Sequence, residues 1–237
     1  MKIIARIQND FRSKFGVPRQ SGLASQVESL VIFEPEYRSA EALRGIEDYS
    51  HLWLLWQFSE SITDKFRPTV RPPRLGGNKR MGVFATRSPF RPNPIGLSSV
   101  RLLGLKKSEK YGIALRVSGA DLMDGTPIYD IKPYLAYTDS HPDAVCGFAA
   151  EFSDYALEVD FPEELLAVLA PHQREAVIEV LKNDPRPSYQ SEESRVYSME
   201  YGDFDIKFTV SGNRLTVCGA EPFGKGEQGR KKNLSEG

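Results

Sequence analysis

Residues 51–58 read HLWLLWQF and are apolar at nearly every position. An apolar run of this length is typical of a strand in the middle of a sheet, covered on both faces. On either side of it, residues 1 to about 145 consist of short β-branched and aromatic runs separated by Gly and Pro clusters, which is typical of an all-β sandwich or barrel. We expect strands at 2–7, 27–33, 51–58, 81–86, 95–105 and 111–117, and a short helical stretch at 39–44.

The pattern changes after residue 145. Asp160 and Glu163 form a capping box ahead of leucines at helical spacing, so a helix is expected there. Pro171 lacks an amide hydrogen and must break or kink that helix, and a second helical segment continues to about Lys182. Strand-like runs follow at 195–201, 204–210 and 214–219. The chain is therefore expected to be mainly β, with an all-β domain at 1–145, a small α+β domain at 146–223 and a disordered tail at 224–237.

The 237 residues are 40% hydrophobic and 27% charged, which is the composition of a folded soluble protein. The charge is unevenly distributed. Residues 65–108 contain eleven Lys or Arg and no Asp or Glu, although the whole chain has a net charge of -1. A segment of this kind attracts polyanions such as nucleic acids. The alternative is a solvated loop whose arginines pair with carboxylates elsewhere in the fold.

Other sequence features bear on location and on metals. No run approaches the length of a membrane span, and charges near the N-terminus interrupt any signal-peptide core, so we expect a cytoplasmic protein. Cys146 and Cys218 lie far apart, without the spacing of a zinc or redox motif. We expect both to be small buried residues, and we expect no metal site.

Four segments combine a stiff backbone with polar side chains. They are the turn VPRQSGL at 17–23, a loop rich in Pro and Arg at 66–80, a loop at 81–96 with three prolines in six residues, and a segment around the sequence DGTP at 124–127. The last segment gathers Asp121, Asp124, Asp130 and Lys132 within twelve residues. Rigid polar groups on loops between core strands are typical of a binding site. The alternative is that these are ordinary turns, with Asp124 capping its own.

Common catalytic templates are absent from the sequence: it has no nucleophile elbow, phosphate-binding loop, glycine-rich dinucleotide loop or HExxH motif. His51 lies within the apolar strand and is expected to be a hydrogen-bonded core residue rather than a general base. The chemistry must therefore depend on Asp, Lys and Asn side chains, or on a reactive cofactor that needs little assistance.

These segments together resemble one family. The match consists of residues 71–77 and 81–96, the PRQxG turn at 18–22, the sequences DGTP and DIKPY within 124–134, and DPRP at 184–187. They resemble the TrmO family of S-adenosylmethionine-dependent tRNA methyltransferases, over almost the whole chain to about Phe223. The resemblance implies a β-barrel methyltransferase domain, S-adenosylmethionine as cofactor, and a homodimer with the cofactor near the subunit interface. It also implies transfer of a methyl group to N6 of N6-threonylcarbamoyladenosine, beside the anticodon of tRNA.

Carried over by residue, the resemblance places the cofactor against three turn residues, the end of the apolar strand, and nearby positions of the later strands. The cofactor-binding residues implied are Gln20, Ser21, Gly22, Ser59, Glu60, Arg87, Leu97, Ser118, Gly119, Ala120 and Asp121. Family members often have His at the position of Ser59, which leaves that contact open.

The carbamoyl group makes the N6 proton of the substrate more acidic than that of adenine, so a carboxylate could act as its base. We expect Asp121 or Asp124 in that role, Lys132 against the anionic substrate group, and Asn93 on the adenine edge. The basic loops are expected to bind the phosphates of the anticodon stem-loop. The predicted tRNA-binding residues are Arg67, Arg71, Arg74, Lys79, Arg80 and Arg91, and Tyr189 of the second domain could extend the same surface.

Two other functions fit parts of this pattern. One is a non-catalytic regulatory module that binds S-adenosylmethionine or a nucleic acid. The other is a hydrolase of small nucleotides, which the lack of metal ligands and of an activated nucleophile disfavours.

Overall fold

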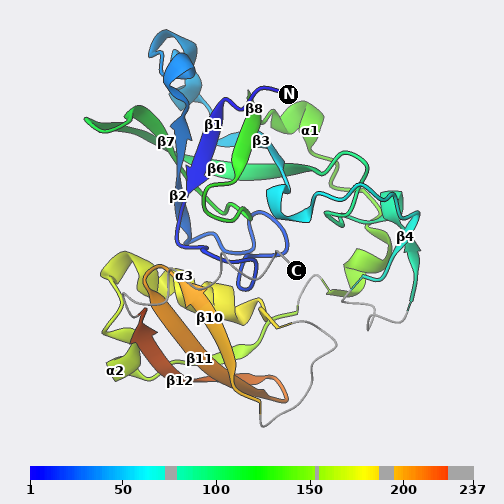
Figure 1. Cartoon of the computed structure of the whole chain (residues 1–237), viewed down its shortest axis with the longest axis vertical. Helices are drawn as coiled ribbons and strands as arrows, with labels where there is room; N and C mark the ends of the chain where they lie inside the picture. Colours follow the sequence, from blue (N-terminus) through cyan, green and yellow to red (C-terminus); the bar gives the residue numbers. More distant parts are fainter. Residues whose placement is uncertain (73–78, 153–154, 187–194, 224–237) are drawn as a thin grey trace.

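The computed structural model describes residues 1–72, 79–152, 155–186 and 195–223. Figure 1 shows two β-rich units one above the other, with the N-terminal loop of the chain passing between them. The mainly β fold is confirmed, with a barrel unit followed by a unit of sheet and helices. The domain boundary at 145 stays a prediction, and the tail at 224–237 lies outside the described residues.

Six antiparallel strands close the barrel in the order β1-β2-β7-β6-β3-β8. Their bounds are β1 Ala5–Gln8, β2 Glu28–Phe33, β3 His51–Gln57, β6 Ile95–Ser108, β7 Gly112–Ser118 and β8 Pro127–Pro133. The ring is closed by pairing of Ala5 with Ile128. Strand β8 was not among the expected strands, because the turn sequence before it and its Asp and Lys residues obscure the alternation of apolar side chains.

Strand β3 lies between β6 and β8, as the apolar run predicts for a central strand. Leu52, Leu54 and Trp56 are buried inside the barrel, whereas the side chains between them are only half-buried. The expectation that both faces would be covered is therefore only half right. A closed barrel has one interior, and the outer face of β3 is covered in part by the short helix α1 (Ala136–Asp139), where Asp139 accepts a 2.8 Å hydrogen bond from the Trp53 indole.

His51 also lies on this outer face. Its ring is half-buried, its Nδ1 is 2.9 Å from the Ser50 hydroxyl, and it packs edge-on against Tyr134. The residue is hydrogen-bonded, as expected, but it is not in the core, because the alternation of β3 turns it outward.

Two expected elements of the first unit take other forms. Residues 81–86 form only the two-residue strand β5 (Met81–Gly82), paired with β4 (Thr69–Val70), and then a 3-10 turn at Val83–Ala85. The helical stretch expected at 39–44 is a 3-10 turn at Glu41–Leu43. Further 3-10 turns lie at Pro35–Tyr37, Ile46–Asp48, Ser59–Ser61 and Gly147–Phe152.

The second unit is a four-stranded sheet in the order β10-β11-β12-β9, packed against helices. Its elements are β9 Glu158–Asp160, α2 Glu163–Leu166, α3 Pro171–Lys182, β10 Tyr197–Tyr201, β11 Phe204–Ser211 and β12 Arg214–Pro222. The expected capping box is wrong: Asp160 ends β9, and Pro162 is the N-cap of α2. Pro171 separates the two helices, as predicted, and occupies the first turn of α3, where a missing amide hydrogen costs nothing.

The two cysteines are exposed rather than buried, which corrects the expectation from their small size. Cys218 lies on β12 at a bulge, where Val217 pairs with Phe208 and Gly219 with Lys207, so its side chain is turned away from the core. Cys146 lies just before the 3-10 turn at Gly147–Phe152.

The barrel has its own core, and the second core is shared by the two units. Phe11, Ala24 and Val27, from the N-terminal loop, are buried in one cluster with side chains of α3 and of the second sheet. The loop between β1 and β2 is thus an integral part of the second unit (Figure 1). In the described residues, no helix is long and apolar enough to cross a membrane.

Candidate active site

The turn at residues 17–23 meets the end of β7 by direct backbone contact. The Gly22 amide donates a 2.8 Å hydrogen bond to the Gly119 carbonyl. Both glycines have positive φ angles, +82° and +77°, and a Cβ on Gly119 would lie 3.3 Å from the Cα and N of Gly22. The missing side chain of Gly119 permits this close approach, whereas a Cβ on Gly22 would meet no atom within 4 Å, and glycine suits that position through its positive φ angle. Residues 20–22 and 118–121, all predicted to bind the cofactor, are therefore brought together.

The carboxylate of Asp121 lies directly beside this contact. It accepts a 2.5 Å hydrogen bond from the Ser98 hydroxyl, and that hydroxyl accepts a 2.9 Å hydrogen bond from the Trp56 indole. Burial raises the pKa of Asp121 above its usual value, against the opposing effects of the Ser98 hydrogen bond, the nearby Arg87 charge and the Ser21 amide. Such a carboxylate is ready to accept a proton.

Arg87 connects the rigid loop after β5 to the turn. Its guanidinium donates a hydrogen bond to the Gln20 side-chain oxygen, and its charge acts on Asp121. The loop itself is held by Arg91, which donates to the carbonyls of Thr86 at 2.7 Å and Val83 at 3.3 Å. The structure thus gives Arg91 a local role, and its contact with tRNA stays a prediction.

Asp124 closes the turn before β8. Its Oδ1 accepts a 3.0 Å hydrogen bond from the backbone amide of Asn9, and its own backbone amide donates to the Phe11 carbonyl at 2.8 Å. These contacts give Asp124 a structural role, but they join its turn to the loop after β1 and do not cap the turn itself. In the described part of the chain, no hydrogen bond or ion pair joins Asp124 to Asp121.

Lys132 and Asn93 are both exposed. The Lys132 ammonium is 2.8 Å from the Asp130 carboxylate, and its residue pairs with Trp53 across the strands. Asn93 is exposed in the loop before β6. Neither contacts Asp121 through a hydrogen bond among the described residues, so both roles stay predictions.

Ser59, Glu60 and Leu97 gather at the adjoining ends of β3 and β6. Ser59 and Glu60 form the 3-10 turn that follows β3, and Lys14 donates to the Glu60 carbonyl at 2.5 Å. Leu97 pairs with Leu55 and is 57% exposed, because its neighbours on β6 turn inward. The structure places these residues near one barrel end but shows no direct contact between them and Asp121 within the described ranges.

The basic segment surrounds β4 and β5. The side chains of Arg67, Arg71, Lys79 and Arg80 are exposed there, and Arg74 lies outside the described residues. No cluster of ligands for a metal ion occurs in the described chain.

Sequence reasoning missed Ser98 and Trp56. The available signal was a hydroxyl at an inward position of a strand that is otherwise apolar on that face. It also missed Gly96, whose absent side chain makes room for the Trp56 ring: a Cβ there would lie 2.2 Å from a ring carbon.

Two family models define the class of this protein. Residues 6–140 match the tRNA-methyltransferase O N-terminal domain, and residues 154–223 match the TrmO C-terminal domain. The chain is 41% identical over 227 residues to a tRNA (adenine(37)-N6)-methyltransferase of Escherichia coli K12, covering 92% of this chain and 96% of the relative. A protein of the same name from Eikenella corrodens is 48% identical over 164 residues, covering 68% and 91%.

Solved structures agree with the sequence comparison. A crystal structure of TrmO superposes with a TM-score of 0.75 at 33% identity, covering 92% of this chain and 97% of that one. The fold and the matched models define a β-barrel methyltransferase. The chain belongs to the TrmO family.

Proposed function

We propose that this chain transfers the methyl group of S-adenosylmethionine to N6 of adenosine 37 in tRNA, with N6-threonylcarbamoyladenosine as the substrate nucleoside. The observation that carries this proposal is the meeting of the turn, the end of β7 and Arg87 around one partly buried carboxylate, Asp121. Relatives that bear the name of this activity support it.

The residues present fit the cofactor. The position that a Cβ would take on Gly22 is open space, which leaves room for a ligand beside the turn, and Arg87 and Asp121 offer a donor and an acceptor there. The part of the site next to the turn would be completed by Gln20, Ser21, Ser118 and Ala120. The opposite part, at the ends of β3 and β6, would be formed by Ser59, Glu60 and Leu97. When bound, S-adenosylmethionine supplies an electrophilic methyl group on a sulfonium centre.

The protein itself must align the substrate with the methyl group and accept the proton from N6. The barrel end must hold N6 of the substrate in line with the methyl carbon and the sulfonium sulfur. As N6 forms its bond to the methyl carbon, the bond from that carbon to the sulfonium sulfur would break and leave a neutral thioether, and the N6 proton would pass to a carboxylate oxygen of Asp121. We assign the base to Asp121 rather than to Asp124, because the Asp124 carboxylate is exposed and accepts a hydrogen bond from the backbone amide of Asn9, in the loop after β1. Asn93 and Lys132 would bind the adenine edge and the threonyl carboxylate.

Recognition of tRNA is assigned to the exposed basic residues around β4 and β5. Arginine and lysine side chains on a stiff ribbon bind phosphates without a large ordering cost. Because tRNA is the substrate, we place the protein in the cytoplasm.

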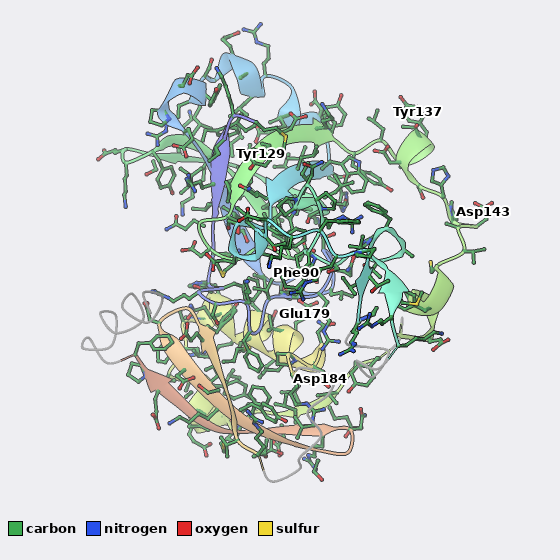
Figure 2. All side chains as sticks on the ribbon, turned by 45° about the vertical axis from the view of Figure 1, so that its right-hand side comes forward. Phe90, Tyr129, Tyr137, Asp143, Glu179 and Asp184 are labelled. Carbon is green, nitrogen blue, oxygen red and sulfur yellow. The ribbon has the colours of Figure 1, made fainter. Side chains whose placement is uncertain are left out.

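Four exposed apolar side chains support a homodimer, and we call them the apolar patch: Phe66, Phe84, Phe90 and Leu97. Phe84 and Phe66 stack with ring centroids 6.4 Å apart, yet they are 72% and 57% exposed. Phe90, labelled in Figure 2, and Leu97 are 51% and 57% exposed. Exposed aromatic side chains that stack on each other, as Phe66 and Phe84 do, are typical of an interface. A second copy of the chain covering them would place the cofactor site near the subunit boundary.

The direct test is transfer of labelled methyl from S-adenosylmethionine to tRNA by wild-type protein and by Asp121→Asn. The proposal expects incorporation by the wild type and a loss of turnover in the variant with the tRNA affinity retained. Binding of cofactor without any transfer would instead favour a regulatory module.

A further inference from the structure

The predicted cofactor turn is held by two domains at once. On its barrel side, residues 20–22 contact Arg87, Gly119 and Asp121. On its other side, the same loop lies against the C-terminal end of α3. In Figure 2, Glu179 is at the position where α3 faces the barrel unit.

Glu179 of α3 and Asn183, the C-cap residue of that helix, bind residues 23–26, directly after residues 20–22. The Glu179 carboxylate accepts a 3.0 Å hydrogen bond from the Ser25 hydroxyl and a 2.7 Å hydrogen bond from the Gln26 amide. The Asn183 side-chain amide donates to the Leu23 carbonyl at 2.8 Å and to the Glu179 carbonyl at 2.9 Å. Carboxylate bonds of this kind are among the stronger hydrogen bonds in proteins.

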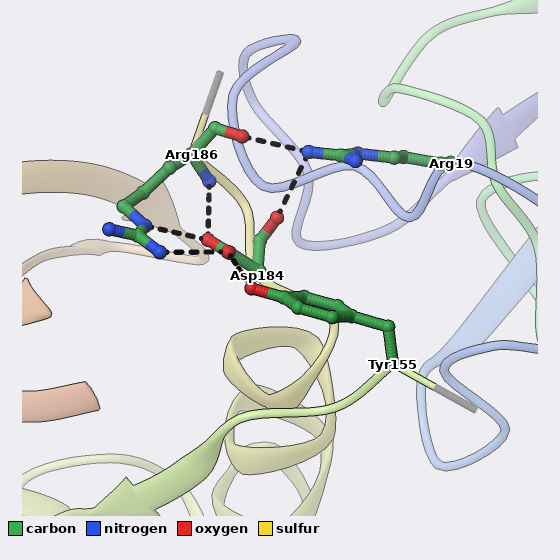
Figure 3. Close-up of polar contacts among 4 residues, drawn as sticks. All are labelled: Arg19, Tyr155, Asp184 and Arg186. Atoms are coloured by element: carbon green, nitrogen blue, oxygen red, sulfur yellow. Dashed lines mark hydrogen bonds and ion pairs between the residues drawn. The ribbon is translucent and has the colours of Figure 1, made fainter. Parts of the chain in front are cut away.

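Arg19, directly before residues 20–22, is held from the same side. Arg19 donates hydrogen bonds to the Arg186 carbonyl at 2.8 Å and the Asp184 carbonyl at 3.3 Å (Figure 3). Those carbonyls are fixed in turn, because the Arg186 guanidinium binds both oxygens of the Asp184 carboxylate, at 2.8 Å and 2.9 Å. The Tyr155 hydroxyl donates to the same carboxylate at 2.7 Å.

The backbone of Asp184, whose carbonyl binds Arg19, has an unusual conformation. Asp184 has a φ of +50°, the one positive φ outside glycine in the described residues. Its side chain is nearly buried, and although burial raises the pKa of Asp184, the hydrogen bonds from Arg186 and Tyr155 outweigh that effect and lower it. Asp184 therefore keeps the charge that holds the Arg186 side chain, and with it the carbonyl that binds Arg19.

The two units are also joined by apolar contacts that do not involve these polar groups. Phe11, Ala24 and Val27 already bury apolar surface in the core of the second unit. The polar contacts of Glu179, Asn183, Asp184 and Arg186 instead fall on both flanks of residues 20–22. Because they flank these residues, the polar contacts are placed to hold the predicted cofactor-binding residues as well as to join the two units.

We infer that Glu179, Asn183 and the Asp184–Arg186 pair are positioning residues for the cofactor-binding turn, so that the C-terminal domain contributes to the S-adenosylmethionine site by holding residues 20–22 from both flanks. This inference rests on the proposed role of Gln20, Ser21 and Gly22 in cofactor binding. It adds to that role a group of residues in the other domain that sets the turn in its binding conformation.

The test compares Glu179→Ala and Asn183→Ala with Glu175→Ala in the full chain. Glu175 is an exposed carboxylate one turn earlier on α3 and serves as the matched control. Calorimetry with S-adenosylmethionine and steady-state methyl transfer are measured for each. We expect the Kd and KM for the cofactor to rise about tenfold in the first two variants, with kcat and the KM for tRNA within about twofold of wild type. The control should match wild type.

A conservative variant distinguishes positioning from general damage. Glu179→Gln keeps an acceptor for the Gln26 amide, and its side-chain amide can pair with the Ser25 hydroxyl, so it should recover most of the cofactor affinity. Unchanged cofactor affinity in folded Glu179→Ala and Asn183→Ala would overturn the inference, whatever happened to the melting temperature. Wild-type protein that failed to bind the cofactor would overturn the proposed function as well, so the two failures can be told apart.

Discussion

The Ser98 hydroxyl donates a 2.5 Å hydrogen bond to the carboxylate of Asp121, and Ser98 is completely buried in the barrel wall. The two residues come from neighbouring strands of the barrel: Ser98 from the inward face of β6, and Asp121 from the segment after β7. The Trp56 indole fixes the hydroxyl from behind. Through this chain of contacts, the core of the barrel sets the orientation and the proton affinity of the group that we assign as the base.

Removal of the Ser98 hydroxyl should shift the pH dependence of the reaction. The Ser98 hydrogen bond lowers the pKa of Asp121, so Ser98→Ala should raise that pKa further above its usual value. A base is active when ionised, so the rate falls as the pH drops through its pKa, and the acidic limb of kcat/KM against pH should move to higher pH in the variant. Ser99→Ala, at the neighbouring outward position of β6, is the control. An unmoved acidic limb in Ser98→Ala would contradict the role of Asp121.

The two candidate carboxylates should separate by mutation. We expect Asp121→Asn to lower kcat by about a hundredfold to ten-thousandfold, the usual contribution of a general base. Asp124→Asn should keep near-wild-type turnover, since an asparagine oxygen can still accept the Asn9 amide. Single-turnover methyl transfer at saturating cofactor measures both. The reverse ranking would move the base to Asp124.

Gly119→Ala should weaken cofactor binding more than its backbone strain alone explains. The new Cβ would meet Gly22 at 3.3 Å, in a conformation that already costs an L-residue about 1–2 kcal/mol. Gly125→Ala is a matched control, because Gly125 has the same φ of +77° but no atom within 4 Å of its Cβ position. Thermal unfolding should show a comparable loss for both, whereas calorimetry should show lost cofactor affinity only for Gly119→Ala. Equal affinities would mean that the contact with Gly22 is unimportant for binding.

The exposed basic residues around β4 and β5 should affect the salt dependence of tRNA binding. Each phosphate contact contributes roughly 0.7–0.9 to the slope of log affinity against log salt. The double variant Arg71→Ala, Lys79→Ala should therefore bind tRNA more weakly and with a slope smaller by about 1.4–1.8. Lys106→Ala, Lys107→Ala removes two charges from the far end of β6 and should leave the slope near its wild-type value. If the first pair behaved like the second, the arginine-rich segment would be structural.

The apolar patch predicts a concentration-dependent assembly. Sedimentation of the wild-type protein should show a dimer, and Phe84→Ser should shift the equilibrium toward the monomer because Phe84 is the most exposed phenylalanine of the patch. Phe66→Ser should act in the same direction, since the two rings stack. A wild-type protein that stays monomeric at all accessible concentrations would overturn the homodimer.

Much of this architecture could be predicted from the sequence, since β2, β3, β6 and β7 are strongly apolar runs whose side chains alternate in the closed barrel. Strand β8 was missed because its polar residues and the preceding turn hide its alternation. The short strand β5 gives way to a 3-10 turn because the loop after it folds back on Val83 through Arg91. The pattern of apolar and polar residues within a short segment does not indicate when a later loop folds back onto it.

The candidate site was predictable to a similar degree. The turn, the glycines and Asp121 stand out as polar or flexible residues next to strands, and the structure brings them together. Ser98, Trp56, Glu179 and Asn183 do not stand out, because their roles depend on partners between 23 and 160 residues away along the chain. Such partners are fixed by the closed barrel and by the packing of α3 on the N-terminal loop.

The most direct test of the proposed reaction uses two matched tRNA samples, one with N6-threonylcarbamoyladenosine at position 37 and one with unmodified adenosine there. Labelled methyl from S-adenosylmethionine should enter the modified sample and stay out of the unmodified one, and the label should be recovered on N6 of nucleoside 37. Label in neither sample, with cofactor binding intact, would contradict the account and leave a protein that binds the cofactor without using it.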